Sequence, residues 1–338
     1  MKADPPNRAQ VYKLIDELSD EHVLKRSPAT YVDGFVTAAL DVYDSGKLYK
    51  VLQKKFFIPT VAQYKDEVYF QSASELTVAH HIKKRQVSNF EIEKRVNAEN
   101  RKDVDVSFRV KSTNVAIEVK CPFEEEPAPY PGTVTIQRAG RTEGTDATYE
   151  QIRRTLESKV SGTKFERGKN RDHRLKDCLT SAHQKFSSES GLEGLNILLL
   201  SCGHFHRMGE WYGCLYGRQE LFTAESFQAP ETYSKVDVVI LSNVKYRHQH
   251  TRNYPTWTLD DVLLLPVVNP HSRRRLLTEP VAEGLSVFNH YLKDFARPQI
   301  ISAMYHPIDP SVDAMTQVNY FVQERLTGDE RARFFPVF

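Results

Sequence analysis

Cysteine is scarce in this chain, with four among 338 residues. Such few and scattered cysteines exclude a disulfide framework and favour a reducing compartment. Long apolar runs are missing as well, because the best of them, at residues 195–200 and 262–268, fall far short of the roughly 20 residues that cross a bilayer. The N-terminus carries no apolar run of the kind found in signal peptides. We therefore expect a soluble cytoplasmic protein with no membrane segment.

An excess of either charge is also absent, since 46 Lys and Arg residues face 44 Asp and Glu residues for a net charge of +2. This balance excludes a global polycation but leaves local basic patches open. Glycine-rich phosphate loops and nucleophilic triads are not recognisable, so ATP-driven translocation is not expected. Apolar residues at 40% and aromatic residues at 11% indicate a folded protein.

The length predicts two domains, or one with large additions, because a domain usually takes about 100–200 residues. Apolar residues recur at helical spacing near the start of the chain, so residues 1–66 are predicted to be a helical N-terminal region. A core is predicted over residues 67–245, with an insertion at about 123–172 that begins with an acidic triplet and several prolines. Residues 246–338 are predicted to be a C-terminal extension packed on the core.

The core is expected to begin with a helix at Ser72, where Ser72 and Glu75 fit a capping box. Three strands, two helices and a strand are then expected, at residues 89–96, 104–110, 115–121, 149–160, 173–187 and 195–201. Without the helix of the insertion, the order is helix, three strands, helix and strand. That order predicts an α/β fold with a mixed sheet.

The most informative stretch is a predicted hairpin whose tip lies at Ser112 and Thr113. In that register one face of the hairpin is entirely apolar. The apolar pairs are Val110 with Val115, Phe108 with Ile117, Val106 with Val119 and Val104 with Cys121. The other face pairs Asp105 with Lys120 and Ser107 with Glu118, which makes Asp105 and Glu118 diagonal neighbours roughly 7–8 Å apart.

Two carboxylates and an amine on one face suit the chemistry of phosphodiesters. Asp105 and Glu118 offer hard oxygen ligands of the kind that Mg²⁺ takes together with waters and substrate phosphate. A metal there would bind a phosphate oxygen and lower the pKa of a bound water. The Lys120 ammonium would orient that water or neutralise the charge that builds on phosphorus.

Asp105, followed on the next strand by Glu118-Val119-Lys120, resembles the D…(D/E)-x-K signature of the restriction-endonuclease-like PD-(D/E)xK nuclease superfamily. The order of elements from Ser72 to about residue 203 also resembles the αβββαβ core of that fold, and the Cys-Pro pair after Lys120 is similar to an ending in some phage-type exonucleases. The resemblance covers well under half of the chain. It departs from the family pattern because no proline precedes Asp105.

The resemblance implies that Asp105 and Glu118 bind Mg²⁺, or Mn²⁺ in its place, together with the backbone carbonyl of Val119. It implies that Lys120 handles the attacking water. Some members of the superfamily add a Glu from the preceding helix, and Glu75 is the candidate here. The implied protein is a metal-dependent nuclease acting on nucleic acid, with DNA favoured over RNA and an oligomer left open.

Plainer interpretations stand beside these assignments. Asp105 and Lys120 can be a cross-strand ion pair on a solvated face, and Glu75 can be only a part of the capping box. Asp103 lies on the same face as Asp105 and competes for its role, although it would be farther from Glu118. The core can also be a nuclease-fold binding or interaction module that no longer cleaves nucleic acid.

Two basic segments would support nucleic-acid binding by releasing counterions. Residues 150–185 hold 10 Lys and Arg against 5 acidic residues, and residues 245–275 hold six Lys and Arg, including Lys245 and Arg247. Charged runs of this kind are also common as solvated helix faces. The sequence leaves open the choice between endo- and exonuclease, any recognition sequence, and the roles of residues 1–66 and 205–338.

Several Cys and His residues are weaker candidates for a metal site. A Cys₂His₂ zinc site could be formed by Cys202, His204, His206 and Cys214. Their Cys-x-His-x-His spacing is unusual, so a buried structural cysteine with strand-end histidines is the favoured interpretation. His248 and His250 form a similar pair with the same interpretation.

Overall fold

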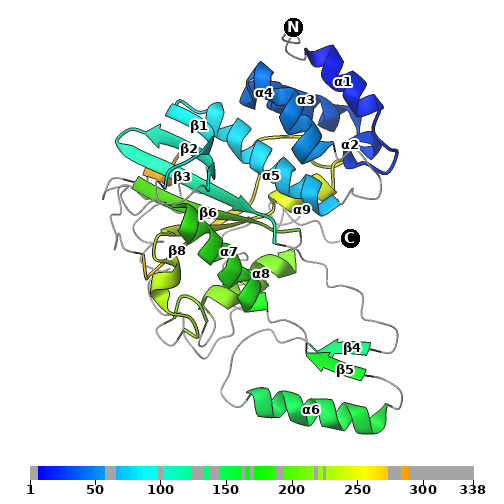
Figure 1. Cartoon of the computed structure of the whole chain (residues 1–338), viewed down its shortest axis with the longest axis vertical. Helices are drawn as coiled ribbons and strands as arrows, with labels where there is room; N and C mark the ends of the chain where they lie inside the picture. The colour runs from blue at the N-terminus through cyan, green and yellow to red at the C-terminus, as the bar shows by residue number, and fades with distance from the viewer. Residues whose placement is uncertain are drawn as a thin grey trace.

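The computed structural model describes residues 7–57, 66–97, 102–122, 133–136, 145–160, 164–167, 171–186, 194–203, 205–216, 220–223, 226–272 and 283–288. Within these residues a six-stranded sheet is covered by helices on both faces (Figure 1). Some of its strands run parallel and others antiparallel. The expected α/β class with a mixed sheet is confirmed.

The sheet has the strand order β1-β2-β3-β6-β7-β8. Its strands are β1 (Ser88–Lys94), β2 (Val104–Val110), β3 (Thr113–Lys120), β6 (Gly194–Ser201), β7 (Val238–Ser242) and β8 (Leu264–Val268). The first three form an antiparallel meander, β6 and β7 run parallel to β3, and β8 is antiparallel to β7. Every residue of β6 and β7 is buried, as expected for apolar strands that are covered on both faces.

The helices of the N-terminal region, together with the first core helix, α5, cover one face of the sheet (Figure 1). They are α1 (Arg8–Asp16), α2 (Val23–Arg26), α3 (Ala29–Val42), α4 (Ser45–Val51), the π-helical turn η1 (Leu52–Phe56) and α5 (Asp66–Lys83). Their apolar side chains, such as Phe35 and Leu76, share one core cluster with Val106, Phe108 and Ile117 of the hairpin.

The expected helix start at Ser72 is wrong. Helix α5 already includes Asp66, so Ser72 lies in its interior and is buried. The Ser-x-x-Glu pattern therefore caps nothing, because a capping box satisfies only the free backbone donors at a helix start. This removes the plain interpretation of Glu75 as a capping residue.

The opposite face of the sheet is covered by α7 (Arg171–Lys185) and α8 (Phe205–Tyr216), with the short 3-10 turn η3 (Pro230–Tyr233) beside them. Leu175 and Leu179 of α7 pack with Leu198 and Leu200 of β6 in a second core cluster. Helix α9 (Val244–Gln249) follows β7, and its first residue, Val244, joins the first cluster.

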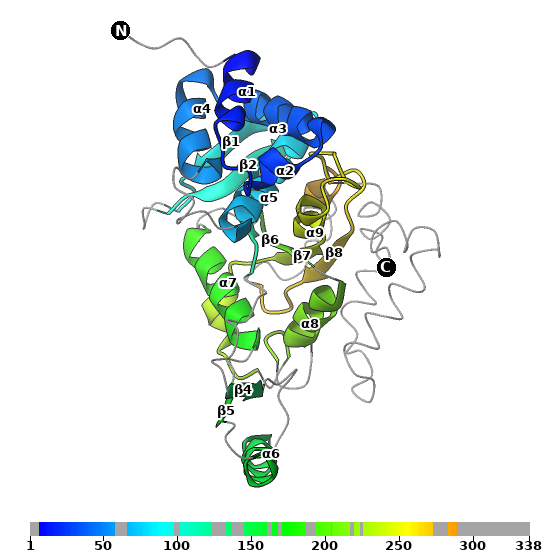
Figure 2. The ribbon, with the colours of Figure 1, turned by 90° about the vertical axis from the view of Figure 1, so that its right-hand side faces the viewer.

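The segment between β3 and α7 contains a small unit of its own. Its strands β4 (Thr133–Ile136) and β5 (Lys164–Arg167) pair in parallel with each other, and α6 (Thr145–Lys159) lies between them in the chain. These elements lie away from the six-stranded sheet in both ribbon views (Figures 1 and 2). They follow the acidic and proline-rich stretch that predicts an insertion.

The hairpin has the expected faces but a different register. Val110 pairs with Thr113 and Phe108 with Val115, so the turn consists of Lys111 and Ser112. Lys111 has a φ of 49°, a conformation that tight two-residue hairpin turns require. The pairing is shifted by two residues from the expected one, and a shift of two keeps each side chain on its own face.

Candidate active site

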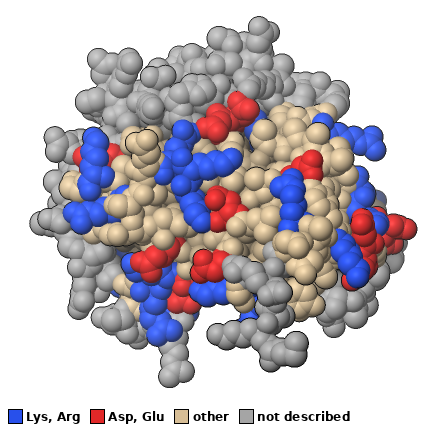
Figure 3. Space-filling model, turned by 90° about the horizontal axis from the view of Figure 1, so that it is seen from above, with Lys and Arg blue, Asp and Glu red and all other residues tan. Residues whose placement is uncertain are grey.

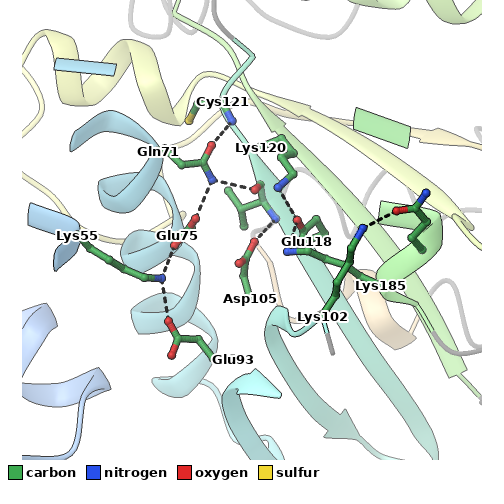
Figure 4. Close-up of polar contacts among 12 residues, drawn as sticks. Lys55, Gln71, Glu75, Glu93, Lys102, Asp105, Glu118, Lys120, Cys121 and Lys185 are labelled. Atoms are coloured by element: carbon green, nitrogen blue, oxygen red, sulfur yellow. Dashed lines mark hydrogen bonds and ion pairs between the residues drawn. The ribbon is translucent and has the colours of Figure 1, made fainter. Parts of the chain in front are cut away.

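The two predicted carboxylates meet where β2 begins and β3 ends. The strand pairing ends with Val106 opposite Ile117, and the next residues on the two strands are Asp105 and Glu118. Continuation of this register places Asp105 opposite Glu118 rather than diagonal to it, and the charge of Glu118 acts on Asp105. The backbone N–H of Val119 donates a hydrogen bond of 2.7 Å to Oδ2 of Asp105, which holds this carboxylate toward β3 (Figure 4).

Glu118 is a fully buried carboxylate held between two ammonium groups. Nζ of Lys120 lies 2.6 Å from its Oε1. Nζ of Lys185, from the last residue of α7, lies 2.6 Å from Oε1 and 2.8 Å from Oε2. A buried charge requires compensation of this kind, because a lone carboxylate in the interior is strongly disfavoured.

Asp105 has a different electrostatic environment. Burial raises the pKa of its carboxyl well above the usual value, and the nearby Glu75 and Glu118 raise it further, whereas Lys185 and the Val119 N–H oppose them. Among the described residues no Lys, Arg or His lies within ion-pair distance of Asp105. The site thus contains one carboxylate with two cationic partners and one with none.

Glu75 reaches the same site from α5 and is tied to the N-terminal region. Nζ of Lys55, on η1, lies 2.9 Å from Oε2 of Glu75 and 2.9 Å from Oε1 of Glu93 on β1. Burial lowers the pKa of Lys55, but Glu75 and the neighbouring Tyr43 outweigh it, so the net pKa is raised. Lys55 is therefore a fixed cation between helix α5 and the edge strand.

Gln71 connects α5 to the end of β3. Its Nε2 donates to the carbonyl of Val119 at 2.9 Å, and its Oε1 accepts from the N–H of Cys121 at 2.6 Å. The same Nε2 lies 2.8 Å from Oε1 of Glu75. The Val119 carbonyl, which the resemblance assigns to the metal, thus accepts one hydrogen bond and keeps a second lone pair.

The environment of Lys120 favours its protonated, cationic form. Burial lowers the pKa of its ammonium, but Glu118 outweighs this effect, with a contribution from Asp105, and the net pKa is raised. A lysine in this state donates hydrogen bonds and positive charge rather than accepting a proton. Its place beside Glu118 suits orientation of a water or stabilisation of charge on a phosphate.

Three residues of this site were not predicted from the sequence, namely Lys55, Gln71 and Lys185. Gln71 has a local signal, because it lies four residues before Glu75 and so shares its helix face. Lys185 ends the basic stretch of residues 150–185, where nothing distinguishes it from its neighbours. Lys55 has no local signal, since only the packing of η1 against α5 brings it to Glu75.

The alternative carboxylate and the candidate histidines do not join the site. Asp103 is 43% exposed and lies 3.8 Å from Nε of Arg95. His248 is buried between the hydroxyls of Tyr31 and Thr77, at 2.7 and 2.9 Å. It is therefore a hydrogen-bonded core histidine, and Nδ1 of His250 faces the carbonyl of Tyr246 at 2.8 Å.

The structure places two members of the predicted zinc set, Cys202 and Cys214, in the second core cluster. The other two, His204 and His206, have side chains outside the described residues. Across the described part of the chain, no three His, Cys, Asp or Glu side chains are grouped closely enough to hold a metal ion together. Mg²⁺ needs fewer, because it binds through one or two carboxylates plus waters and phosphate, and Asp105 and Glu118 supply that donor set.

The basic segment at residues 245–275 offers fewer exposed cations for binding phosphate than its composition predicts. Lys245 is buried, with its Nζ 2.7 Å from Oε2 of Glu67, and Arg247 is buried against the backbone of Asp261. Neither of them can form a surface patch for phosphate. Figure 3 views the molecule from above Figure 1, where the N-terminal helices lie, and basic and acidic side chains are interspersed over that face.

No family model, curated protein or solved structure matches this chain. Over the residues that the structure describes, every helix is too short or too polar to cross a membrane.

Proposed function

We propose that this chain is a Mg²⁺-dependent nuclease that hydrolyses phosphodiester bonds, with DNA as the favoured substrate. The observation that carries the proposal is the meeting of Asp105 and Glu118 across the β2–β3 pair with the Lys120 ammonium 2.6 Å from Glu118. When the unit of β4, α6 and β5 is set aside, the remaining order α5, β1, β2, β3, α7, β6 supports it, because it resembles the αβββαβ order of restriction-endonuclease-like nucleases.

In this proposal Asp105 and Glu118 would hold the metal, with the Val119 carbonyl as a third oxygen. The bound ion would supply a water of lowered pKa and positive charge on a phosphate oxygen. Lys120 would donate hydrogen bonds to the attacking water or to the phosphate. Glu75, held in place by Lys55 and Gln71, would orient a water in the shell around the site.

A second candidate function is a nuclease-fold module that binds nucleic acid without cleaving it. One observation favours it: Lys120 and Lys185 both lie 2.6 Å from Glu118, so side chains of the protein itself compensate this carboxylate. Such a module would bind nucleic acid equally well with a divalent cation and with EDTA, and it would show no turnover.

The test is cleavage of circular single-stranded, circular double-stranded and linear DNA, and of RNA, with Mg²⁺, Mn²⁺ or EDTA. We expect metal-dependent cutting that Lys120→Ala and Glu118→Gln reduce by about 100-fold or more, the range for loss of one charge-stabilising group. Asp103→Asn is the matched control because Asp103 is a half-buried carboxylate two residues from Asp105 that lies outside the site, and it should cut like the wild type. Cutting of circles would identify an endonuclease.

Equal cutting by the wild type and Lys120→Ala would refute the assigned site. Binding without cleavage by the wild type, on DNA and RNA alike, would establish the second candidate. Circular dichroism of each variant separates a loss of activity from a loss of folding.

A further inference from the structure

The positive charge of the site is distributed unequally between its two carboxylates. Lys185 places its ammonium against both oxygens of Glu118, at 2.6 and 2.8 Å, and Lys120 adds a second ammonium at 2.6 Å. Asp105 has only the Val119 N–H, among the described residues. The ammonium of Lys185 therefore occupies the oxygens of Glu118 that a cation held by the two carboxylates would use.

A metal ion would compete with this ammonium for Glu118, because Lys185 contacts both carboxylate oxygens whereas Lys120 contacts one. Mg²⁺ lies about 2.0–2.1 Å from its oxygen ligands, inside the shell that Nζ of Lys185 now occupies. Like charges at such separations also repel strongly when water is excluded. A divalent cation held by Glu118 and Asp105 would therefore weaken or displace the contact of the Lys185 ammonium with Glu118.

Lys185 is able to make that move. It is the last residue of α7, and its side chain is 17% exposed while Glu118 is fully buried. A lysine ammonium on a flexible four-carbon stem can leave one carboxylate and remain close to the site. Lys120 differs because it lies on β3 itself, two residues from Glu118, and its place is set by the strand.

We propose that Lys185 is the built-in counter-ion of the metal site, which holds Glu118 in place without metal and yields it to an incoming divalent cation. The proposal rests on the proposed nuclease function. Lys185 is thus a positioning residue that competes with the metal, and its released ammonium is free to meet the phosphate of a substrate. The site would load with metal best when an anionic substrate draws Lys185 away.

The test measures metal binding rather than cleavage. Ca²⁺ is the probe for calorimetry and thermal unfolding, because it takes the same oxygen ligands as Mg²⁺. We expect Lys185→Gln to unfold at a lower temperature than the wild type without metal, to bind Ca²⁺ at least about tenfold more tightly, and to gain more thermal stability from it. Lys185→Arg keeps the competing charge and should bind Ca²⁺ as weakly as the wild type.

Lys176→Gln is the matched control, since Lys176 lies on the same helix and pairs with the exposed Asp177 at 3.2 Å. Glu118→Gln should abolish binding. If the wild type binds Ca²⁺ through Glu118 and Lys185→Gln binds it no more tightly, the counter-ion proposal fails while the nuclease proposal stands. If neither the wild type nor Lys185→Gln binds Ca²⁺, the metal-dependent function fails too.

A measurement on the unaltered protein covers the case in which Lys185→Gln does not fold. The ¹⁵N signal of the Lys185 ammonium, assigned by its loss in Lys185→Arg, should shift when Ca²⁺ binds. A signal that stays unchanged while Ca²⁺ occupies the site would overturn the proposal.

Discussion

Asp105 and Glu118 are neighbouring carboxylates in different electrostatic environments. Glu118 is neutralised by Lys120 and Lys185, so its buried charge is compensated. Burial and the nearby Glu75 and Glu118 instead raise the pKa of Asp105. An acid whose pKa rises on folding destabilises the fold once it ionises, because the folded state then holds its proton more tightly than the unfolded state.

This difference predicts the behaviour of Asp105→Asn. Without metal, the variant should unfold at a higher temperature than the wild type at neutral pH, because it removes a disfavoured charge. The gain should vanish at pH values below the usual pKa of an aspartate, where Asp105 is protonated in both states. Divalent cations should stabilise the wild type but not the variant. Thermal unfolding with and without Mg²⁺ checks all three, and a variant less stable at neutral pH would contradict the assigned environment.

A second prediction concerns His248 and the loss of protein stability at acidic pH. Burial, with a smaller effect of Arg247, lowers the pKa of His248 to about 3. Between an unfolded value of about 6.5 and that pH, the unfolded chain binds a proton that the folded chain does not, so stability falls as the pH falls. Replacing the histidine should remove up to about 1.4 kcal/mol per pH unit of this dependence.

The variant is His248→Gln, which retains a polar group between Tyr31 and Thr77. Urea unfolding at several pH values between 4 and 6 measures the slope of stability against pH for both proteins. Parallel slopes would show that His248 is not the group that titrates on unfolding.

Among the elements, α3 shows how close packing against a neighbouring residue restricts the side chains that a helix can carry. A Cβ on Gly34 would lie 2.6 Å from Cδ1 of Trp257, whereas a Cβ on Gly46 of α4 would meet no atom within 4 Å. Alanine stabilises a helix interior by about 0.5–1 kcal/mol over glycine. Substitution of alanine at Gly46 therefore tests helix propensity alone, whereas the same substitution at Gly34 adds a packing clash.

We expect Gly34→Ala to destabilise the protein by about 1–3 kcal/mol, the usual range for overpacking, in spite of its helix propensity. Gly46→Ala should be neutral or stabilising, because nothing opposes the added methyl group. Denaturant unfolding of the two variants tests this contrast. Equal effects of the two substitutions would show that Trp257 does not restrict α3.

At the scale of the whole molecule, the N-terminal helices and the sheet share one hydrophobic core. Phe35 and Leu48 are buried in one cluster with Val106 and Ile117. The unit of β4, α6 and β5 contributes no described side chain to either core cluster. The two segments therefore differ in how far folding depends on them.

Removal of residues 1–57 should abolish cooperative unfolding, because it uncovers apolar surface on the sheet and on α5. Replacement of residues 123–167 by a short Gly/Ser linker should preserve cooperative unfolding. Calorimetry of the two shortened chains makes the comparison. A cooperative transition in the chain without residues 1–57 would show that this region is an independent domain.

The hairpin illustrates what local pattern can predict. The alternation of side chains predicted that Asp105, Glu118 and Lys120 share one face, and this held although the pairing shifted by two residues. The six elements expected after α5 were found, because apolar periodicity is a property of neighbouring residues, but strands β4 and β5 of the insertion were not predicted. The start of α5 was not predicted either, since a buried helix that is apolar on many sides gives no clear boundary.

Contacts between distant segments required the folded chain. Lys55 of η1 reaches Glu75, Gln71 of α5 reaches the Val119 carbonyl, and Lys185 of α7 reaches Glu118, and no spacing in the sequence relates the two members of any of these pairs. Burial also depends on the folded chain, since Lys245 pairs with Glu67 inside the protein whereas Arg252 of the same segment is exposed. Periodicity assigns each residue to a face of its own element, whereas the packing of elements assigns it a partner and a dielectric environment, and the chemistry of this site depends on both.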